Sequence, residues 1–325
     1  MSRRKKRRPK GLLRITLLGV FAGLFFATTL ISEITVLTYE RPVAAPRGLT
    51  YVTTNGYQTH YVAWGKPSRN PIVLIHGAFE STYIWGPVAK LLGTSHHVEA
   101  YDLKGYGYTT HVGPYNTQAL AHQLAAFLRA RHLERPILVG HSLGAGVIAQ
   151  FVVDYPHVAA GVVFLDGDGL STSIPASGVS KWIPSLYRTA LYDTLVRNNW
   201  LVRTIFEAAC GPACPPVTPA VLSSIERPLE VAGAEQSFFA YASQPIVGVS
   251  ASQVAHLGAT GVRALVIFGT HDIRFSSQSA RHTAQRLRAG APVMIKNAGH
   301  LALWSHPVEV ARAINTFATS LSAAK

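Results

Sequence analysis

A serine flanked by two glycines lies at a position typical of a hydrolytic nucleophile. Residues 140–144 read Gly-His-Ser-Leu-Gly. The apolar run before them (136–139) predicts a buried strand, and the small and apolar residues after them (145–153) predict a helix. Between a strand and a helix, G-x-S-x-G predicts a nucleophile elbow, a tight turn that lifts the serine hydroxyl above a sheet. Glycines at both ends remove side chains that would collide in that turn, so the pattern favours a catalytic Ser142 over a chance glycine-rich turn.

A serine hydroxyl is a weak nucleophile unless a histidine removes its proton and an acid orients that histidine. His300 follows the last predicted strand (292–295), with a glycine just before it, and Asp272 follows the predicted strand 263–268. The carboxyl ends of parallel strands meet at one edge of a sheet. The chain order Ser142, Asp272, His300 is also the order expected with a nucleophile elbow. We therefore predict a triad of these three residues.

Two other carboxylates compete with Asp272 for the acid position. Asp166 and Asp168 close the predicted strand 160–165, which comes directly after the elbow. They also begin the next segment, where aspartate often serves in a turn or as a helix cap. We therefore prefer Asp272, and we expect His141, inside the elbow, to pack beside the nucleophile without transferring protons.

The reaction of a serine with an ester places negative charge on the substrate oxygen, which backbone N–H groups must stabilise. The N–H of Leu143 directly follows the nucleophile. The loop after the predicted strand 71–76 is expected to supply a second donor, either Ala78 or Phe79. His76, at the end of that strand, is expected to be buried and bound to the loop backbone.

Five motifs together resemble the α/β-hydrolase superfamily, in its capped branch. They are His76-Gly77, Asp102-Leu-Lys-Gly-Tyr-Gly107, Gly140-His-Ser-Leu-Gly144, Gly269-Thr-His-Asp272 and Gly299-His300. The resemblance covers about residues 48–320 and implies an eight-stranded sheet with one antiparallel strand, a nucleophile–acid–histidine triad and a lid of helices. Epoxide hydrolases and haloalkane dehalogenases of this branch use an aspartate nucleophile, so a serine at position 142 favours ester chemistry. Many members carry an acidic residue where Ser305 stands, a departure outside the triad.

The elements around these residues alternate between strand and helix patterns from 49 to 168 and again from 258 to 325. This alternation predicts an α/β core with a mostly parallel sheet flanked by helices. Residues 169–257 interrupt it with predicted helices and many aromatic side chains, among them Trp182 and Trp200. An insertion of this kind at the end of a strand predicts a helical cap over the active site.

The N-terminal segment is basic and then apolar. Residues 1–14 carry eight of the positive charges in a net charge of +14, and 18 uncharged residues (15–32) follow. Such a run is just long enough to span a bilayer, and no clean A-x-A cleavage site follows it. We predict a basic cytoplasmic tail (1–14), a transmembrane anchor (15–37) and a linker (38–48), with the catalytic domain on the extracytoplasmic side. A secreted form, released by signal cleavage, is the alternative.

The chain has two cysteines, Cys210 and Cys214. They and their neighbours supply too few ligands for a zinc site. In an oxidising compartment they would form a small disulfide loop, and two free thiols are the alternative that the sequence leaves open.

Taken together, the residues predict a membrane-anchored serine hydrolase that cleaves carboxylic esters through an acyl-enzyme on Ser142. An aromatic cap and a membrane anchor favour a small-molecule or lipid-like ester as the substrate. A C–C bond hydrolase and a cofactor-free perhydrolase of the same fold are alternatives, and their difference would lie in the pocket. A non-catalytic binding protein is disfavoured because all three triad positions are filled. We expect no cofactor, no metal and no nucleic-acid partner, since a basic terminus beside an apolar run indicates a membrane.

Overall fold

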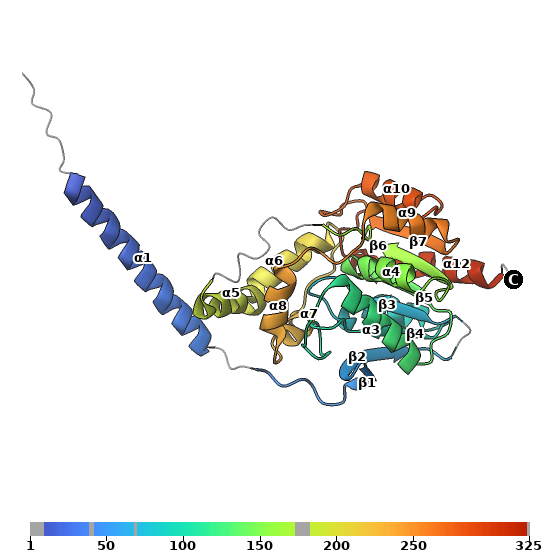
Figure 1. Ribbon diagram of the computed structural model, residues 1–325, viewed down its shortest axis with the longest axis horizontal. Coiled ribbons are helices and arrows are strands. Elements are labelled where there is room, and N and C mark those ends of the chain that lie inside the picture. Colours follow the sequence, from blue (N-terminus) through green and yellow to red (C-terminus); the bar gives the residue numbers. More distant parts are fainter. Residues whose placement is uncertain (1–9, 39–41, 68–69, 173–182, 324–325) are drawn as a thin grey trace, which may run out of the picture.

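The computed structural model describes residues 10–38, 42–67, 70–172 and 183–323, without the side chains of 10–19 and 22. Its centre is an eight-stranded sheet with the order β1-β2-β4-β3-β5-β6-β7-β8 (Figure 1). The strands are β1 (Thr50–Thr54), β2 (Tyr57–Trp64), β3 (Ile72–Ile75), β4 (Val98–Tyr101), β5 (Ile137–His141), β6 (Gly161–Leu165), β7 (Arg263–Gly269) and β8 (Val293–Ile295). In this sheet β2 runs antiparallel to β1 and β4, and the other pairs are parallel. The predicted α/β fold with a mostly parallel sheet is confirmed.

The strands β3 and β6 carry no polar side chain, because helices cover both faces of the sheet. Successive side chains of a strand point to opposite faces. In β5, Leu138 packs into one core cluster, while Ile137 and Val139 pack into the other. All three side chains are buried, so the continuous apolar run before the elbow reflects burial on two sides.

The helices form layers on the two faces of the sheet. One core cluster contains buried residues of α3, α4, α9 and α10, and the other contains buried residues of α2, α11 and α12. These helices are α2 (Gly86–Leu92), α3 (Thr117–Ala130), α4 (Leu143–Asp154), α9 (Ala251–Ala259), α10 (Ser277–Arg286), α11 (Ala302–Ser305) and α12 (Pro307–Ala323), and the 3-10 helix η1 (Thr82–Trp85) precedes α2. The sheet therefore holds the ends of β5, β7 and β8, which carry the predicted triad, in a rigid frame.

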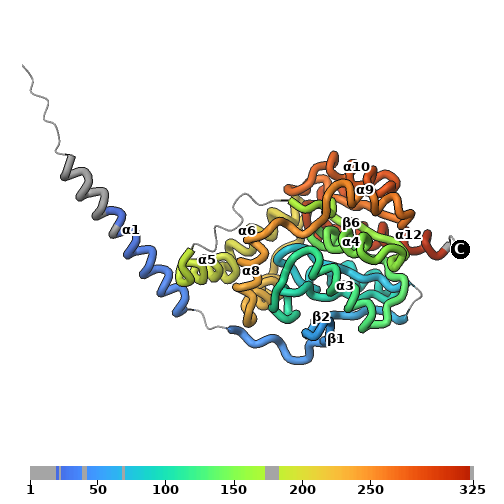
Figure 2. The backbone as a smooth tube through the Cα atoms, in the orientation of Figure 1, coloured from blue at the N-terminus to red at the C-terminus, as the bar shows by residue number. Residues whose placement is uncertain are grey.

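Between β6 and α9 the chain leaves the sheet and forms helices that lie between the core and the N-terminal helix (Figure 2). They are α5 (Ser185–Arg197), α6 (Asn199–Cys210), α7 (Pro219–Glu226), the 3-10 helix η3 (Arg227–Leu229) and α8 (Ala234–Ala242). We call these helices the cap. The helix α9, which the sequence places mostly in the cap, instead joins the sheet core because Val254 and Leu257 are buried there. The predicted cap residue Trp182 lies outside the described residues.

The N-terminal helix α1 (Lys10–Thr38) extends away from the sheet and contacts α5 of the cap (Figure 1). At this contact the Thr29 hydroxyl is hydrogen-bonded to the Tyr187 hydroxyl, and the rings of Phe25 and Tyr187 lie 6.3 Å apart. The predicted transmembrane segment 15–37 lies within α1, but part of it falls outside the described side chains. Among the helical residues that are described, none forms a stretch long and apolar enough to cross a membrane.

Candidate active site

The predicted nucleophile lies in a strained turn between β5 and α4. Ser142 has φ 50° and ψ −113°, a backbone conformation that non-glycine residues rarely adopt and that often marks a functional site. A Cβ atom at Gly140 would lie 2.4 Å from the carbonyl carbon of Gly144, and one at Gly144 would lie 2.3 Å from the carbonyl oxygen of Ile75. Both glycines are therefore required for the turn that presents the serine hydroxyl.

The structure brings the three predicted triad residues together. Nε2 of His300 lies 3.0 Å from Oγ of Ser142, and Nδ1 of His300 lies 2.9 Å from Oδ2 of Asp272. The Asp272 side chain is fully buried and that of His300 is 11% exposed. With Nδ1–H donating to the carboxylate, Nε2 is free to accept the serine proton. This geometry suits general-base activation of a serine nucleophile.

Asp272 is held for this role by its own loop. Its other oxygen, Oδ1, accepts hydrogen bonds from the backbone N–H groups of Arg274 and Phe275, at 2.6 and 3.1 Å. The ring of Phe275 stacks on the imidazole of His300, with centroids 5.8 Å apart. The loop after β7 therefore orients both the acid and the base.

The two other candidate acids, Asp166 and Asp168, accept hydrogen bonds from backbone N–H groups and not from His300. Oδ1 of Asp166 accepts the backbone N–H of Gly269 at 2.7 Å, and Oδ1 of Asp168 accepts that of Leu170 at 3.0 Å. Burial raises the pKa of Asp166 well above its ordinary value, although the charge of His141 opposes the rise. The carboxylate that the structure places on His300 is that of Asp272.

His141 and Glu80 form a buried ion pair beside the triad. Nδ1 of His141 donates to the Glu80 carboxylate at 2.9 Å, and Nε2 donates to the backbone carbonyl of His300 at 2.8 Å. Burial lowers the pKa of His141, but the charge and hydrogen bond of Glu80 outweigh it and raise this pKa to about 9. His141 is thus an imidazolium with both nitrogens donating.

This ion pair also connects the site to the predicted oxyanion loop. The Glu80 carboxylate accepts the backbone N–H of Gly77 at 2.7 Å, so one carboxylate holds both the loop after β3 and the elbow histidine. The expectation that His141 packs beside the nucleophile agrees with this position, whereas the contact with Glu80 was not predicted. An acid four residues after the strand-end His76 was the available signal.

The predicted oxyanion donors lie on two adjacent loops. Leu143 is the first residue of α4, and the N–H groups of a first helical turn have no acceptor within the helix. Phe79 has φ 61°, a second strained residue at the site. Its ring contacts Phe238 of cap helix α8, with centroids 4.8 Å apart. The oxyanion loop is therefore in contact with the cap.

His76 has the structural role expected for it. Its Nδ1 donates to the Gly77 carbonyl at 2.7 Å, and its Nε2 accepts the backbone N–H of Leu103 at 2.9 Å. Burial lowers the pKa of His76 despite the nearby carboxylates of Asp102 and Glu80. A neutral His76 thus joins the oxyanion loop to the loop after β4.

The sequence from residue 72 to 313, more than half of the chain, matches the Alpha/beta hydrolase family. The protein therefore belongs to this family.

Curated relatives match part of this chain, and solved structures of similar fold match most of it. A probable alcohol acetyltransferase of Wickerhamomyces anomalus is 33% identical over 126 residues, which cover 38% of this chain and 36% of the relative. The first curated relatives are thus matched over about 36% to 40% of their length. A thermophilic esterase of Thermogutta terrifontis has a TM-score of 0.66 and 21% identity, covering 84% of this chain and 98% of its own. A membrane phospholipase A has the same TM-score and identity, covering 96% and 98%.

Proposed function

We propose that the protein is a serine hydrolase that cleaves carboxylic esters through an acyl-enzyme on Ser142. The observation that carries this proposal is the pair of contacts of His300, 3.0 Å to Oγ of Ser142 and 2.9 Å to Oδ2 of Asp272. His300 takes the serine proton as Oγ attacks the ester carbonyl, and the Asp272 carboxylate stabilises the imidazolium that forms.

The tetrahedral intermediate carries its negative charge on the former carbonyl oxygen. The N–H of Leu143 and one N–H of the Ala78–Phe79 loop would stabilise it. His300 then protonates the departing alcohol and the acyl-enzyme remains. A water molecule that loses its proton to His300 attacks the acyl carbon, and breakdown of the second intermediate releases the acid and regenerates Ser142.

The experiment that tests this proposal is covalent labelling with a fluorophosphonate. The parent protein is expected to form an adduct on Ser142, and the Ser142→Ala variant is expected to form none while keeping the same thermal unfolding. A folded parent that stays unlabelled after extended incubation would contradict the proposal. Hydrolysis of p-nitrophenyl esters of increasing acyl length would then define the acyl pocket.

A second candidate function is acyl transfer to an alcohol, and the similarity to an alcohol acetyltransferase favours it. Both reactions use the same acyl-enzyme and differ only in the acceptor. A competition between water and ethanol, with the free acid and the ethyl ester measured as products, separates the two. The C–C bond hydrolase and perhydrolase alternatives stay predictions, to be tested with diketone and peracid assays.

We also propose that the N-terminal segment anchors the catalytic domain on the extracytoplasmic side of a membrane. Its support is the basic tail followed by 18 uncharged residues. In addition, several described apolar side chains of α1 are exposed, among them Phe21, Phe26 and Leu37. The likeness to a membrane phospholipase A covers 96% of this chain, so it extends into the N-terminal segment.

Membrane anchoring is tested by carbonate extraction and by protease protection. An anchored protein stays in the carbonate-resistant pellet, and its catalytic domain is digested only from the extracytoplasmic side. A soluble protein of the full-length mass would overturn the anchor, and a soluble protein shortened by the segment before the linker would identify the secreted alternative.

A further inference from the structure

We propose that the disulfide between Cys210 and Cys214 positions the catalytic His300, so that the triad is aligned only while this disulfide is oxidised. Cys210 and Cys214 take no part in the proposed reaction. The effect of their disulfide on catalysis rests on the proposed function. The cysteine pair thus has a role beyond stabilising the cap.

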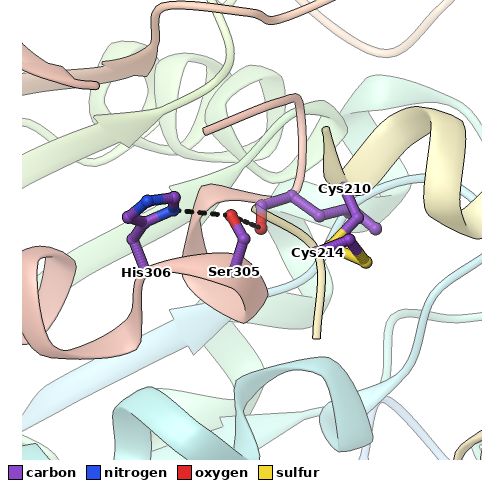
Figure 3. Close-up of a disulfide and its surroundings, with 5 residues drawn as sticks. Cys210, Cys214, Ser305 and His306 are labelled. Carbon is purple, nitrogen blue, oxygen red and sulfur yellow. Dashed lines mark hydrogen bonds between the residues drawn. A yellow bond between two sulfur atoms is a disulfide. The ribbon is translucent and has the colours of Figure 1, made fainter. Parts of the chain in front are cut away.

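The disulfide lies where the cap reaches the active site. Cys210 is the last residue of α6 and is fully buried, and its Cα atom lies 5.2 Å from that of Cys214. The turn between them is also closed by a hydrogen bond from the Cys214 N–H to the Gly211 carbonyl, at 3.1 Å. Figure 3 shows the disulfide next to Ser305 of α11, the short helix that follows the catalytic histidine.

Two backbone hydrogen bonds from the end of α6 bracket the catalytic histidine. The N–H of Gly299 donates to the Cys210 carbonyl at 3.0 Å, and the N–H of Leu301 donates to the Ala209 carbonyl at 3.2 Å. The residues immediately before and after His300 are thus both bound to the last two residues of the helix. The position of His300 in the chain therefore follows the position of this helix end.

The two segments approach so closely that glycine is required on both sides. A Cβ atom at Gly211 would lie 2.5 Å from the backbone nitrogen of Gly299, and one at Gly299 would lie 2.3 Å from the Ala209 carbonyl oxygen. Such contacts leave no room for a shift of one segment alone. A displacement of the turn after α6 is therefore transmitted directly to the His300 loop.

The carbonyls that hold this loop need an external restraint. The last four carbonyls of a helix find no N–H donor within the helix, and helix ends fray. A disulfide restricts the motion of the segment that it closes. Without the cross-link, the turn 210–214 gains conformations in which the Ala209 and Cys210 carbonyls no longer meet the His300 loop, and a misplacement of about 1 Å can cost about 10²-fold in rate.

The corresponding chemical step is thiol–disulfide exchange with a small-molecule thiol. Two thiols give up two electrons and two protons, the bond between the Cys210 and Cys214 sulfurs breaks, and the products are two cysteine thiols and the disulfide of the small molecule. A reducing compartment would thus hold the enzyme in its less active form. Arrival in an oxidising compartment would align the triad.

The test compares oxidised and reduced protein, with the redox state verified by the mass of thiol-alkylated samples. Reduction with dithiothreitol is expected to lower the second-order rate constant of fluorophosphonate labelling at least tenfold. Amide hydrogen exchange in the peptide containing 299–301 is expected to increase, while exchange in β5 stays unchanged. The Cys214→Ala variant keeps the buried Cys210 side chain, and it is expected to behave like reduced parent and to be insensitive to dithiothreitol.

Three results would overturn the inference. Reduced parent that is labelled as fast as oxidised parent would show that the disulfide does not affect the triad. Unchanged exchange at 299–301 would show that it does not hold the loop, and faster exchange in β5 as well would show a global loss of structure. If the oxidised parent is not labelled at all, the proposed function fails, and the exchange measurement still decides whether the disulfide positions the His300 loop.

Discussion

Two regions of the molecule hold His300 and its neighbours, and they do so with different chemistry. On the sheet side, the buried His141 imidazolium donates to the His300 carbonyl and is itself paired with Glu80. On the cap side, the carbonyls of Ala209 and Cys210 accept the N–H groups that flank His300. The first support is an ion pair inside the sheet core, and the second is a backbone pairing closed by a disulfide.

The difference between the two supports predicts different sensitivities. An ion pair in the core contributes to global stability and changes with pH, because its strength depends on protonation. A backbone pairing at the end of an insertion contributes mainly to local alignment and changes with thiols. The position of His300 is therefore expected to depend on pH through His141. It is also expected to depend on the redox state of the Cys210–Cys214 disulfide through the end of α6.

The largest loss of activity is expected when a residue of the triad itself is changed. The losses expected from the two supports of His300 are compared with it. Asp272→Asn is expected to reduce kcat roughly 10⁴-fold, because the amide favours the wrong histidine tautomer. Asp166→Asn is the matched control, since its amide oxygen can still accept the Gly269 N–H that Asp166 accepts at 2.7 Å. Steady-state kinetics on a p-nitrophenyl ester would measure both. An equal loss in the two variants would contradict the assignment of Asp272 as the acid.

The next largest effect is expected from the sheet side. The pKa of His141 is raised from 6.5 to about 9 in the folded protein. While Glu80 is ionised, the stabilisation from a charged His141 is therefore fully present below pH 6.5, and it is lost as the pH rises through 9. A shift of this size corresponds to about 3 kcal/mol in the free energy of unfolding. Glu80→Gln removes the carboxylate, so burial alone lowers the pKa of His141 and the loss disappears.

The measurement for Glu80→Gln is the melting temperature of parent and variant between pH 6 and 10. We expect the parent to lose stability from pH 6.5 to 9, whereas the variant starts lower and shows no such loss. We also expect kcat/KM to fall about tenfold, because a neutral His141 keeps only one N–H and loses its hydrogen bond either to the His300 carbonyl or to residue 80, at roughly 1–3 kcal/mol per unsatisfied buried group. Parallel melting curves at every pH would rule out a charged His141.

A smaller effect is expected from the cap side when its backbone contact is forced apart. In Gly299→Ala the new methyl group would lie 2.3 Å from the Ala209 carbonyl oxygen, and overpacking of this kind costs about 1–3 kcal/mol. Most of this cost is expected to appear as a loss of kcat, up to about tenfold, with a small change in the melting temperature. Gly290→Ala is the control, because a Cβ atom there meets nothing within 4 Å. If Gly299→Ala lowers stability but leaves kcat unchanged, the loop does not depend on the cap.

The fold could be predicted from the sequence, and so could the three residues that the structure brings together, Ser142, Asp272 and His300. Both predictions depend on short-range patterns. The apolar run before Ser142 and the glycines at 140 and 144 predict a strand and a turn without any knowledge of distant contacts. The strand ends before Asp272 and His300 locate the other two members by topology alone.

A sequence signal existed for Glu80, but the contacts that support His300 could not be predicted, because they join segments that are far apart in the chain. Glu80 and His141 are separated by 61 residues, and Ala209 and Leu301 by more. No local pattern specifies that the end of a cap helix meets the loop after β8. The same limit explains α9: its apolar spacing indicates a helix, but burial of Val254 and Leu257 against the sheet is a tertiary contact.

The smallest effect is expected where the cap contacts the oxyanion loop without touching the triad. The rings of Phe238 and Phe79 lie 4.8 Å apart, and an aromatic pair contributes about 0.5–1.5 kcal/mol beyond its buried area. Phe238→Leu is therefore expected to raise KM for a bulky ester two- to tenfold and to leave kcat within twofold, since the supports of His300 stay intact. Trp200→Leu is the matched control, because this cap side chain is 71% exposed. A kcat loss in Phe238→Leu as large as that in Gly299→Ala would mean that the cap orients the oxyanion loop as well as His300. The contact between Phe238 and Phe79 would then be a third support of the active site.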